Sequence, residues 1–281
     1  PGVLGIYVNL MTRGNVLKII KNAKKHGWKV VVGGPEAANY PENYIRYHAD
    51  AVVIGEGEQT LAELLPELDK SGPNHLHKIP GVVFMDDDGR IIRNPERSTM
   101  LDINLLPWPD RDQIDIQRYV DVWHEHHGMG SINLITARGC PYRCKWCSHS
   151  VFGYSHRRRD YIDCADEVEH LLNTYRPDQV WYADDVFTIS HPWLYNYSKE
   201  LKRRNIRLPF ETISRADRMM KEDVLQTLSD MGCYRVWIGS ESGSQRILDA
   251  MQRQVKVEEV EWATKTAQKY GIEVGMFLMW G

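Results

Sequence analysis

Apolar residues in the first hundred positions follow two alternating patterns. Short runs rich in Val and Ile, typical of buried strands, alternate with stretches whose apolar residues recur every three or four positions, as on one face of a helix. Strands are predicted over residues 3–8, 28–32 and 51–54, and helices over residues 16–25, 44–48 and 59–68. Two further strands, 81–85 and 90–93, flank Asp-Asp-Asp-Gly, which is typical of a hairpin turn. This order predicts an α/β domain with a parallel sheet over residues 1–100.

The same alternation begins again at residue 131. Strands are predicted over 132–136, 179–183, 209–213, 234–239 and 272–279, and helices over 165–175, 193–203, 221–231, 244–250 and 258–269. Five strands joined by helical crossovers predict most of a β/α barrel over residues 131–281. Between the two series, residues 101–130 are predicted to form a linker. Its Leu-Pro-Trp-Pro sequence is rigid and non-helical, because each Pro restricts its own backbone and that of its neighbour.

The composition narrows the class of protein. A chain of 281 residues with 42% hydrophobic and 26% charged residues is typical of a soluble globular protein of two domains. The net charge of -3 argues against a general nucleic-acid binder. No apolar run approaches the length of a membrane span, and no signal peptide is recognisable. Five cysteines, three of them clustered, suit a reducing cytoplasm and not a disulfide framework, so we expect a cytoplasmic protein. The chain lacks a start methionine and begins almost at once with a strand, so we expect an internal fragment of a longer protein.

Three of the five cysteines, Cys140, Cys144 and Cys147, form a Cys-x3-Cys-x2-Cys triplet just after the strand at 132–136. Cysteine thiolates hold iron–sulfur clusters, normally four of them for a 4Fe–4S cubane. A triplet supplies one thiolate fewer, so it would leave one iron free to bind something other than protein. Gly139 and Pro141 give the loop a sharp entry.

The triplet and the chain's other cysteines and histidines also allow alternatives to a cluster. A structural zinc site could use the triplet with His149 as the fourth ligand, although zinc sites usually have a second ligand pair far along the chain. The isolated Cys164 and Cys233 are predicted to be small buried apolar residues. The histidine-rich stretch 124–127 is predicted to be a solvated charged turn, and the basic run 156–159 a solvated run or, alternatively, a source of one arginine for the site.

Two strand ends in the first domain are rich in glycine. They are Gly33 and Gly34 after the second strand, and Gly55, Glu56, Gly57 and Glu58 after the third. Open parallel sheets bind ligands outside the carboxyl ends of their strands, and glycine lets a backbone approach a ligand closely. The same residues are equally explained as tight strand-to-helix turns without a ligand.

Strand ends in the second domain carry polar residues on otherwise apolar strands. Besides the triplet, these are Asp184 and Asp185, Ser214 and Arg215, and Glu241. In β/α barrels the functional residues lie at the carboxyl ends of the strands. A single such residue could simply cap the next helix, as could Asp185 or Ser242. Polar residues at every strand end together favour a binding site.

The triplet, with Trp146 before its last cysteine, resembles the signature of radical S-adenosylmethionine (SAM) enzymes, whose fold is a partial (β/α)6 barrel. The resemblance implies that Cys140, Cys144 and Cys147 hold a 4Fe–4S cluster and that SAM chelates the fourth iron. It further implies that Asp184 and Asp185 meet the SAM amino group, that Ser214 and Arg215 lie near its carboxylate and sulfonium, and that Glu241 accepts from the ribose hydroxyls. Trp146 and the backbone of residues 275–277 would face the adenine.

The first domain resembles the Rossmann-like cobalamin-binding domain that precedes many radical SAM enzymes. The similarity lies in Gly-Gly-Pro at 33–35 and in Asp-Ala-Val-Val-Ile-Gly-Glu-Gly-Glu at 50–58. The Asp-x-His-x-x-Gly motif that ligates cobalt in other cobalamin proteins is absent from this chain. In this respect the chain resembles a class of proteins that binds cobalamin without a protein histidine. The implied cobalamin contacts are Gly33, Gly34, Gly55, Glu56, Gly57 and Glu58.

Together these resemblances imply a cobalamin-dependent radical SAM enzyme. The expected activity is methyl transfer to an unactivated carbon or phosphorus centre of a small-molecule substrate, with an external electron donor such as flavodoxin or ferredoxin. Oxidative cyclisation or rearrangement on the same scaffold is one alternative, and a non-catalytic zinc- or cluster-binding scaffold is another. Methylthio transfer is disfavoured, because the first domain has no second cysteine triplet.

Overall fold

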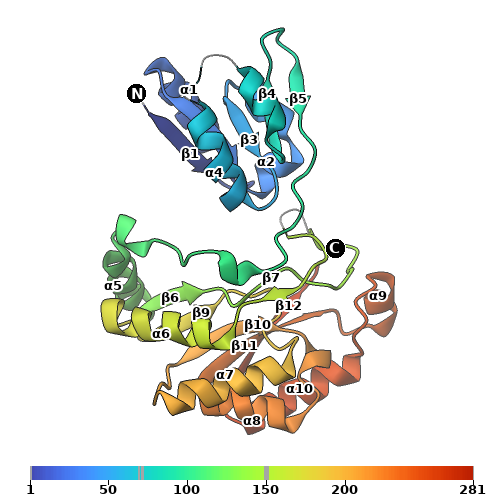
Figure 1. Ribbon diagram of the computed structural model, residues 1–281. Helices are drawn as coiled ribbons and strands as arrows, with labels where there is room; N and C mark the ends of the chain where they lie inside the picture. The colour runs from blue at the N-terminus through green and yellow to red at the C-terminus, as the bar shows by residue number, and fades with distance from the viewer. Residues whose placement is uncertain (1, 69, 71–72, 149–151, 281) are drawn as a thin grey trace. The chain divides into compact units, whose positions relative to one another are not determined.

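The structure is a computed structural model that describes residues 2–68, 70, 73–148 and 152–280 (Figure 1). It contains two compact units. The first comprises Pro1–Met100 with Ser148–Gly153, and the second comprises Leu101–Cys147 with Tyr154–Gly281. In the described part of the chain no helix is long and apolar enough to cross a membrane.

The first unit is a five-stranded sheet in the order β1-β2-β3-β4-β5. Its strands are β1 (Val3–Tyr7), β2 (Lys29–Gly33), β3 (Ala51–Val53), β4 (Val82–Met85) and β5 (Ile91–Arg93). β1, β2 and β3 are parallel, whereas β4 and β5 pair antiparallel, which confirms the predicted parallel sheet and the hairpin.

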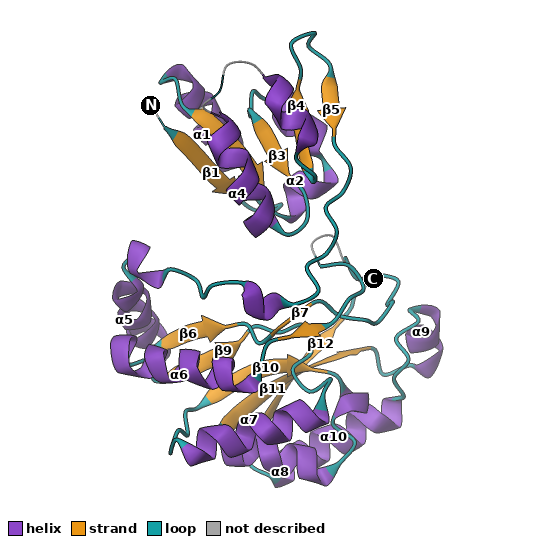
Figure 2. Ribbon diagram, in the orientation of Figure 1, coloured by secondary structure: helices purple, strands orange, loops and turns teal. Residues whose placement is uncertain are grey.

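Helices cover both faces of this sheet (Figure 2). They are α1 (Arg13–Lys25), α2 (Pro35–Asn39), α3 (Pro41–Arg46) and α4 (Gly57–Leu68), with a 3-10 helix, η1 (Pro73–Lys78). Along β2 the buried side chains alternate between two cores, because successive residues of a strand point to opposite faces. Val30 and Val32 pack with α1, α2 and α3, and Val31 packs with α4. Helix α2, which begins at Pro35, was not predicted.

The second unit is built on a parallel sheet in the order β12-β11-β10-β9-β6. The strands are β6 (Ser131–Leu134), β9 (Gln179–Tyr182), β10 (Phe210–Ser214), β11 (Cys233–Glu241) and β12 (Glu273–Leu278). The crossovers are α6 (Tyr161–Tyr175), α7 (His191–Arg203), α8 (Glu222–Met231), and α9 (Gln245–Ala250) with α10 (Val257–Lys269); a 3-10 turn, η4 (Ala216–Arg218), precedes α8. Strands neighbouring in sequence are neighbours in the sheet, which confirms the predicted partial barrel.

The crossover helices pack on one face of the second sheet and bury its main core (Figure 2). Val180 and Tyr182 of β9 belong to this core, and Trp181 between them faces the other way. Cys164 and Cys233 are buried in the same core, as predicted. The opposite face of the sheet is therefore left for the side chains of alternate residues.

The segment 101–130, predicted as a linker, belongs to the second unit and contains a helix, α5 (Ile116–His127), after two 3-10 turns, η2 (Ile103–Leu105) and η3 (Arg111–Gln113). The turn predicted at residues 124–127 is wrong, because these residues form the last turn of α5. The carboxylate of Asp115 caps the start of α5 by accepting from the backbone N–H of Arg118 (3.1 Å), and Gly128, with φ of 78°, ends it. These caps outweigh the poor helix propensity of the histidines.

Buried ion pairs tie this segment to the barrel. The carboxylate of Glu167 on α6, 1% exposed, lies 2.7 Å from Arg111 Nη1 and 2.5 Å from Arg159 Nη1. Trp108 Nε1 also donates to Asp163 Oδ1 of α6 at 2.9 Å. The Pro-rich stretch is thus held against α6 by Trp108 within it and by Arg111 just after it.

Replacing Glu167 with alanine should lower the free energy of unfolding of the second unit by about 3–5 kcal/mol, because the largely buried Arg111 loses its counter-charge and Arg159 is left with Asp163 alone. Urea unfolding followed by circular dichroism measures this. The matched control is Glu261→Ala, which removes an exposed pair with Lys265 (2.6 Å) and should have a much smaller effect, because solvent screens that pair. Equal effects of the two substitutions would contradict the anchoring role of Glu167.

Candidate active site

The cysteine loop is closed at its base by a small ribbon that the sequence did not predict. β7 (Ala137–Arg138) pairs antiparallel with β8 (Arg157–Arg158). Gly139, with φ of 82°, follows β7, and a Cβ there would collide with the carbonyl oxygen of Ser155. Only glycine allows this close approach, so Gly139 brings the two ends of the loop together.

The three thiols of the triplet lie within electrostatic reach of one another. Cys144 is buried, and Cys140 and Cys147 are half-buried. Burial raises the pKa of Cys140 and of Cys147, and the neighbouring thiols add to both shifts, as does the carboxylate of Asp185. Ionised together, these thiols would repel one another unless positive charge lies among them. Bound metal supplies such charge and favours the thiolate form, so the donor set fits an iron–sulfur cluster.

A zinc site finds less support in the geometry. Among the described residues, no group of three or more His, Cys, Asp or Glu side chains is arranged to hold a metal ion. A single zinc ion draws all its ligands to within about 2.0–2.3 Å of one point. A cubane instead takes each cysteine on a different iron, and so needs more widely spaced thiols. His149, the proposed fourth zinc ligand, lies outside the described residues.

The adjacent carboxylates after β9 occupy different environments. Asp184 is buried and accepts from Thr136 N (2.7 Å), Thr136 Oγ1 (2.5 Å) and Ala137 N (3.1 Å). Asp185 is exposed, and its charge acts on Cys140 and Cys147. Asp184 therefore contacts the start of the cysteine loop, and Asp185 lies near the thiols.

The basic run 156–159 is not solvated, so that part of the prediction is wrong. Arg158 donates to Thr136 Oγ1 (2.8 Å) and Phe187 O (2.9 Å), and its Nη1 lies 3.3 Å from Asp184 Oδ2. Its guanidinium also stacks over the ring of Trp193, 4.3 Å from the centroid. Thr136, before the cysteine loop, and Arg158, after it, thus contact the same buried carboxylate, that of Asp184. The local sequence could not reveal this contact.

Ser214 and Arg215, at the end of β10, point to different groups. Ser214 Oγ is buried, 2.5 Å from Thr188 Oγ1. Arg215 is 1% exposed, lies over the ring of Tyr142 at 3.5 Å from its centroid, and places Nη1 3.8 Å from Cys144 Sγ. The structure therefore brings Arg215 to the cysteine loop, whereas Ser214 contacts the turn after β9.

Glu241 ends β11 with φ of 59°, in the left-handed region that non-glycine residues rarely adopt. Its side chain is buried, and burial raises its pKa although the nearby Arg253 lowers it. Arg253 Nε lies 3.9 Å from Glu241 Oε1, and Arg253 Nη1 lies 3.6 Å from Cys144 Sγ. Arg253 was not predicted as a site residue, because it lies in the loop between α9 and α10 and no local sequence pattern marks it.

The region predicted to face the adenine, around Trp146 and residues 275–277, contains one further aromatic ring, that of Trp237. Trp146 is largely exposed, and the ring of Trp237 packs against the backbone of Gly275. Trp237 also stacks on Phe277, with centroids 5.5 Å apart and an interplanar angle of 22°. Strand β11 therefore contributes an aromatic ring to this region that was not predicted.

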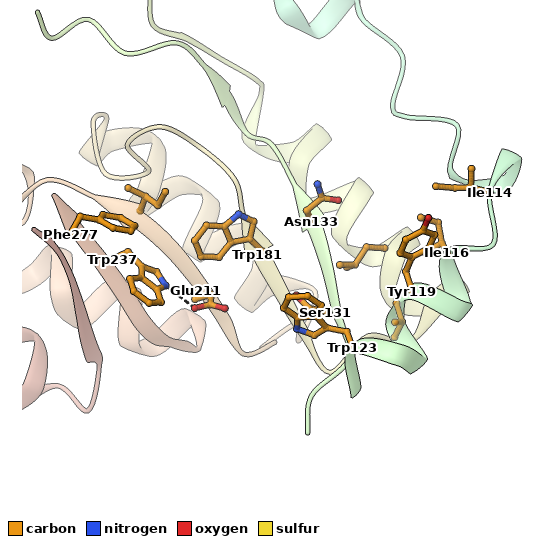
Figure 3. Close-up of a pocket in the computed structure, with 13 residues that line it drawn as sticks. Ile114, Ile116, Tyr119, Trp123, Ser131, Asn133, Trp181, Glu211, Trp237 and Phe277 are labelled. Atoms are coloured by element: carbon orange, nitrogen blue, oxygen red, sulfur yellow. Dashed lines mark hydrogen bonds between the residues drawn. The ribbon is translucent and has the colours of Figure 1, made fainter. Parts of the chain in front are cut away.

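Below these strand ends, a cavity of about 630 Å³ lies on the sheet face opposite the crossover helices (Figure 3). Trp181 and Trp237 project into it from the strands, and Trp123 from α5. Glu211 is its carboxylate among the described lining residues, and Trp237 Nε1 donates to Glu211 Oε2 at 2.8 Å. Helix α5, in the segment predicted as a linker, thus forms one wall of the cavity.

In the first unit, the ends of the parallel strands combine glycines with exposed apolar side chains. A Cβ at Gly34 would collide with the backbone of Val8, so packing alone explains this glycine. Gly55 has open space where a side chain would stand. Leu10 and Met11, after β1, are both exposed and were not predicted as site residues. Exposed apolar side chains and an open glycine at the same edge of the sheet fit one face of a large planar cofactor.

The other residues predicted at this edge lie in the turn from β3 into α4. Glu56 Oε2 accepts from the backbone N–H of Met100 at 3.3 Å, and Gly57 and Glu58 begin α4. Gly33 is the last residue of β2. The structure therefore gathers these residues at the carboxyl edge of β2 and β3.

Two family profiles match the chain. Residues 134–281, just over half of it, match the Radical SAM superfamily, and residues 1–65 match the B12 binding domain. The cofactors of these domains are a 4Fe–4S cluster, SAM and cobalamin, as predicted.

The chain is also similar to two curated methyltransferases. The chain is 30% identical to an uncharacterized methyltransferase, PH0819, of Pyrococcus horikoshii, over 99% of this chain and 60% of that protein. It is 27% identical to cytidylyl-2-hydroxyethylphosphonate methyltransferase of Streptomyces wedmorensis, over 89% of this chain and 51% of that protein. The chain thus spans a little over half the length of these curated relatives.

The fold is shared with a solved structure, that of the cobalamin-dependent S-adenosylmethionine radical enzyme OxsB with aqua-cobalamin bound. The TM-score is 0.81 at 21% identity, covering 99% of this chain and 41% of that one. The superfamily profile covers the cysteine loop and all the barrel strand ends described above. The chain therefore belongs to the radical SAM superfamily, with a B12-binding domain preceding its radical SAM domain.

Proposed function

We propose that this chain is the catalytic part of a cobalamin-dependent radical SAM methyltransferase. The observation that carries the proposal is the convergence of three thiols, two buried guanidinium groups and a buried carboxylate at the carboxyl edge of one parallel sheet. When bound, the cluster supplies the electron that cleaves SAM reductively, and cobalamin carries the methyl group. The protein's own residues bind these groups and orient them.

Cys140, Cys144 and Cys147 would hold the cluster. Two guanidinium groups beside Cys144 offset the negative charge that three thiolates bring into a buried site. Glu241 can accept hydrogen bonds from the hydroxyls of a ribose, and its burial keeps water from competing for them. Asp185, near the thiols, would meet the amino group of SAM, and Trp146 would lie over the adenine.

Asp184 has a positioning role in this proposal. Its carboxylate binds two successive backbone N–H groups, of Thr136 and Ala137, where β6 passes into β7. It also pairs with Arg158, on the strand that leaves the cysteine loop. One buried carboxylate therefore holds both ends of the loop, and its acceptor sites are largely used in doing so.

The carboxyl edge of the first unit would hold cobalamin through Gly33, Gly34, Gly55, Glu56, Gly57 and Glu58. Leu10 and Met11 would cover an apolar part of the corrin. For the substrate we propose a small molecule with an apolar part, because the cavity beside the barrel strands is lined by three tryptophans. A separate one-electron donor of the flavodoxin or ferredoxin class would reduce the cluster.

The cysteine assignment predicts that Cys144→Ala abolishes the formation of 5′-deoxyadenosine from SAM, with a loss of about 100-fold or more, because the cubane loses one of three ligands. Product would be quantified by liquid chromatography after anaerobic reconstitution and reduction. Cys164→Ala removes another buried thiol, one on α6 that faces the main core, and should retain both iron and activity. Product formation by Cys144→Ala at the level of the unmodified protein would refute the proposal.

The cobalamin assignment predicts that Met11→Glu weakens hydroxocobalamin binding about tenfold or more, because a charge replaces an apolar contact. Met11 is 89% exposed, so the substitution should leave the fold intact. Met85→Glu is the control, since Met85 is 41% exposed and lies at the end of β4, which runs antiparallel to β3 and so ends at the opposite edge. Equal affinities of the two variants, measured by absorbance titration, would contradict the proposed edge.

The positioning role of Asp184 predicts that Asp184→Asn lowers the iron bound per chain after reconstitution severalfold, because buried Arg158 loses its counter-charge and the loop its anchor. Asp178→Asn is a matched control. Asp178 lies just before strand β9, whereas Asp184 lies just after it. Its carboxylate accepts from the backbone N–H of Gly130 (2.6 Å), which lies just before the start of β6. Iron contents that fall equally in both variants would show a general loss of folding instead.

A further inference from the structure

Two guanidinium groups point at the same cysteine. Arg253 Nη1 lies 3.6 Å from Cys144 Sγ, and Arg215 Nη1 lies 3.8 Å from it on another side. These are ordinary distances for an N–H donor to a sulfur acceptor. Cys144 is also the most buried of the three thiols, at 8% exposed. Both guanidinium groups therefore come within hydrogen-bond reach of the Cys144 sulfur.

Arg253 is held in place by the backbone around it. Its Nη2 and Nε donate to the carbonyl oxygen of Gly239 at 2.7 and 3.2 Å, and its own carbonyl accepts from Arg215 Nη2 at 2.8 Å. A Cβ at Gly239 would collide with Arg253 Nη2, so only glycine leaves room for the guanidinium. The contact between Arg253 and Cys144 is thus prepared by the barrel strand and does not depend on a mobile side chain.

The loop that carries Arg253 is also joined to the cysteine loop directly. Lys145 N donates to Met251 O at 2.9 Å. The residues on either side of Arg253, Gln252 and Gln254, both have φ in the left-handed region, at 53° and 54°. Such conformations cost about 1–3 kcal/mol each and persist only where the surroundings enforce them. The backbone therefore accepts strain to present this one side chain.

The counter-charges of the two arginines differ. Arg215 Nε pairs with Asp217 Oδ1 at 2.9 Å. For Arg253, which is 7% exposed, the carboxylate within 4 Å in the described part of the chain is Glu241, and at 3.9 Å it lies beyond hydrogen-bond distance. A buried guanidinium without a hydrogen-bonded anion is strongly unfavourable. A thiolate at Cys144 would supply that anion, so the charge of Arg253 is matched to a ligated cysteine.

We propose that Arg253 is a positioning residue that tunes the 4Fe–4S cluster electrostatically, by donating a hydrogen bond to the Cys144 thiolate and thereby raising the reduction potential of the cluster. The inference rests on the proposed function, because it requires Cys144 to be a cluster ligand. Hydrogen bonds to cluster sulfurs and nearby positive charge stabilise the reduced state, which carries one more electron. The electron comes from a one-electron reductant, and the guanidinium neither gains nor loses a proton.

The test compares Arg253→Gln and Arg253→Lys with the unmodified protein after anaerobic reconstitution. Iron and sulfide per chain are measured first, and the reduced cluster is then followed by electron paramagnetic resonance during redox titration with dithionite. Arg253→Gln should lower the ratio of reduced to oxidised cluster at a fixed potential about tenfold, which is about 59 mV for a one-electron couple. Arg253→Lys retains the charge and should restore most of the shift. Arg246→Gln, an exposed arginine on α9, removes the same net charge and should leave the potential unchanged.

The outcomes separate this inference from the function on which it rests. Failure of the unmodified protein to assemble a cluster would overturn the proposed function itself. A full complement of iron in Arg253→Gln with an unchanged potential would overturn the inference alone. If Arg253→Gln loses the cluster, the lysine variant decides: a cluster of near-native potential supports the electrostatic role, and loss of the cluster in both variants with native circular dichroism shows a purely structural role.

Discussion

The parallel arrangement of the five barrel strands is the constraint on which the rest of the second unit depends. Because every strand runs in the same direction, all carboxyl ends meet at one edge of the sheet. Segments far apart in the chain, such as the cysteine loop after β6 and Glu241 at the end of β11, are thereby brought together. Each crossover helix can vary in length without moving these ends, since the register between strands fixes them.

Buried charge has to balance at this edge, and the balance explains the choice of residues there. Asp184 pairs with Arg158 on the side of the loop that faces β9, and Arg215 pairs with Asp217 near Cys144. Arg253 has no carboxylate within hydrogen-bond distance among the described residues, and the proposed Cys144 thiolate would serve as its counter-charge. A site filled with cationic side chains would be costly on its own, and the negative charge of thiolates would offset that cost. Arginine suits this task, because its planar group donates to several acceptors at once.

The sequence predicted those features whose signals are local. The cysteine triplet lies within eight residues, and the barrel strands follow from the alternation of apolar runs, so both were recognisable without a structure. Helix α5 was missed, because its evidence is a pair of caps around a histidine-rich stretch that has little helix propensity. The burial of Arg158 was missed for a different reason. A basic run is solvated unless a distant acidic group is folded against it, and Asp184 lies 26 residues further along the chain.

The contact between Arg253 and Cys144 shows this limit most clearly, because it joins residues 109 positions apart. No period or spacing in the sequence can encode such a contact. It depends on Gly239, which leaves room for the guanidinium, and on left-handed backbone at Gln252 and Gln254. Neither glutamine is a residue type that favours that conformation. Strain carried by non-glycine residues indicates that the position of the side chain between them matters more than the local backbone energy, as is common at sites prepared in advance for a charged group.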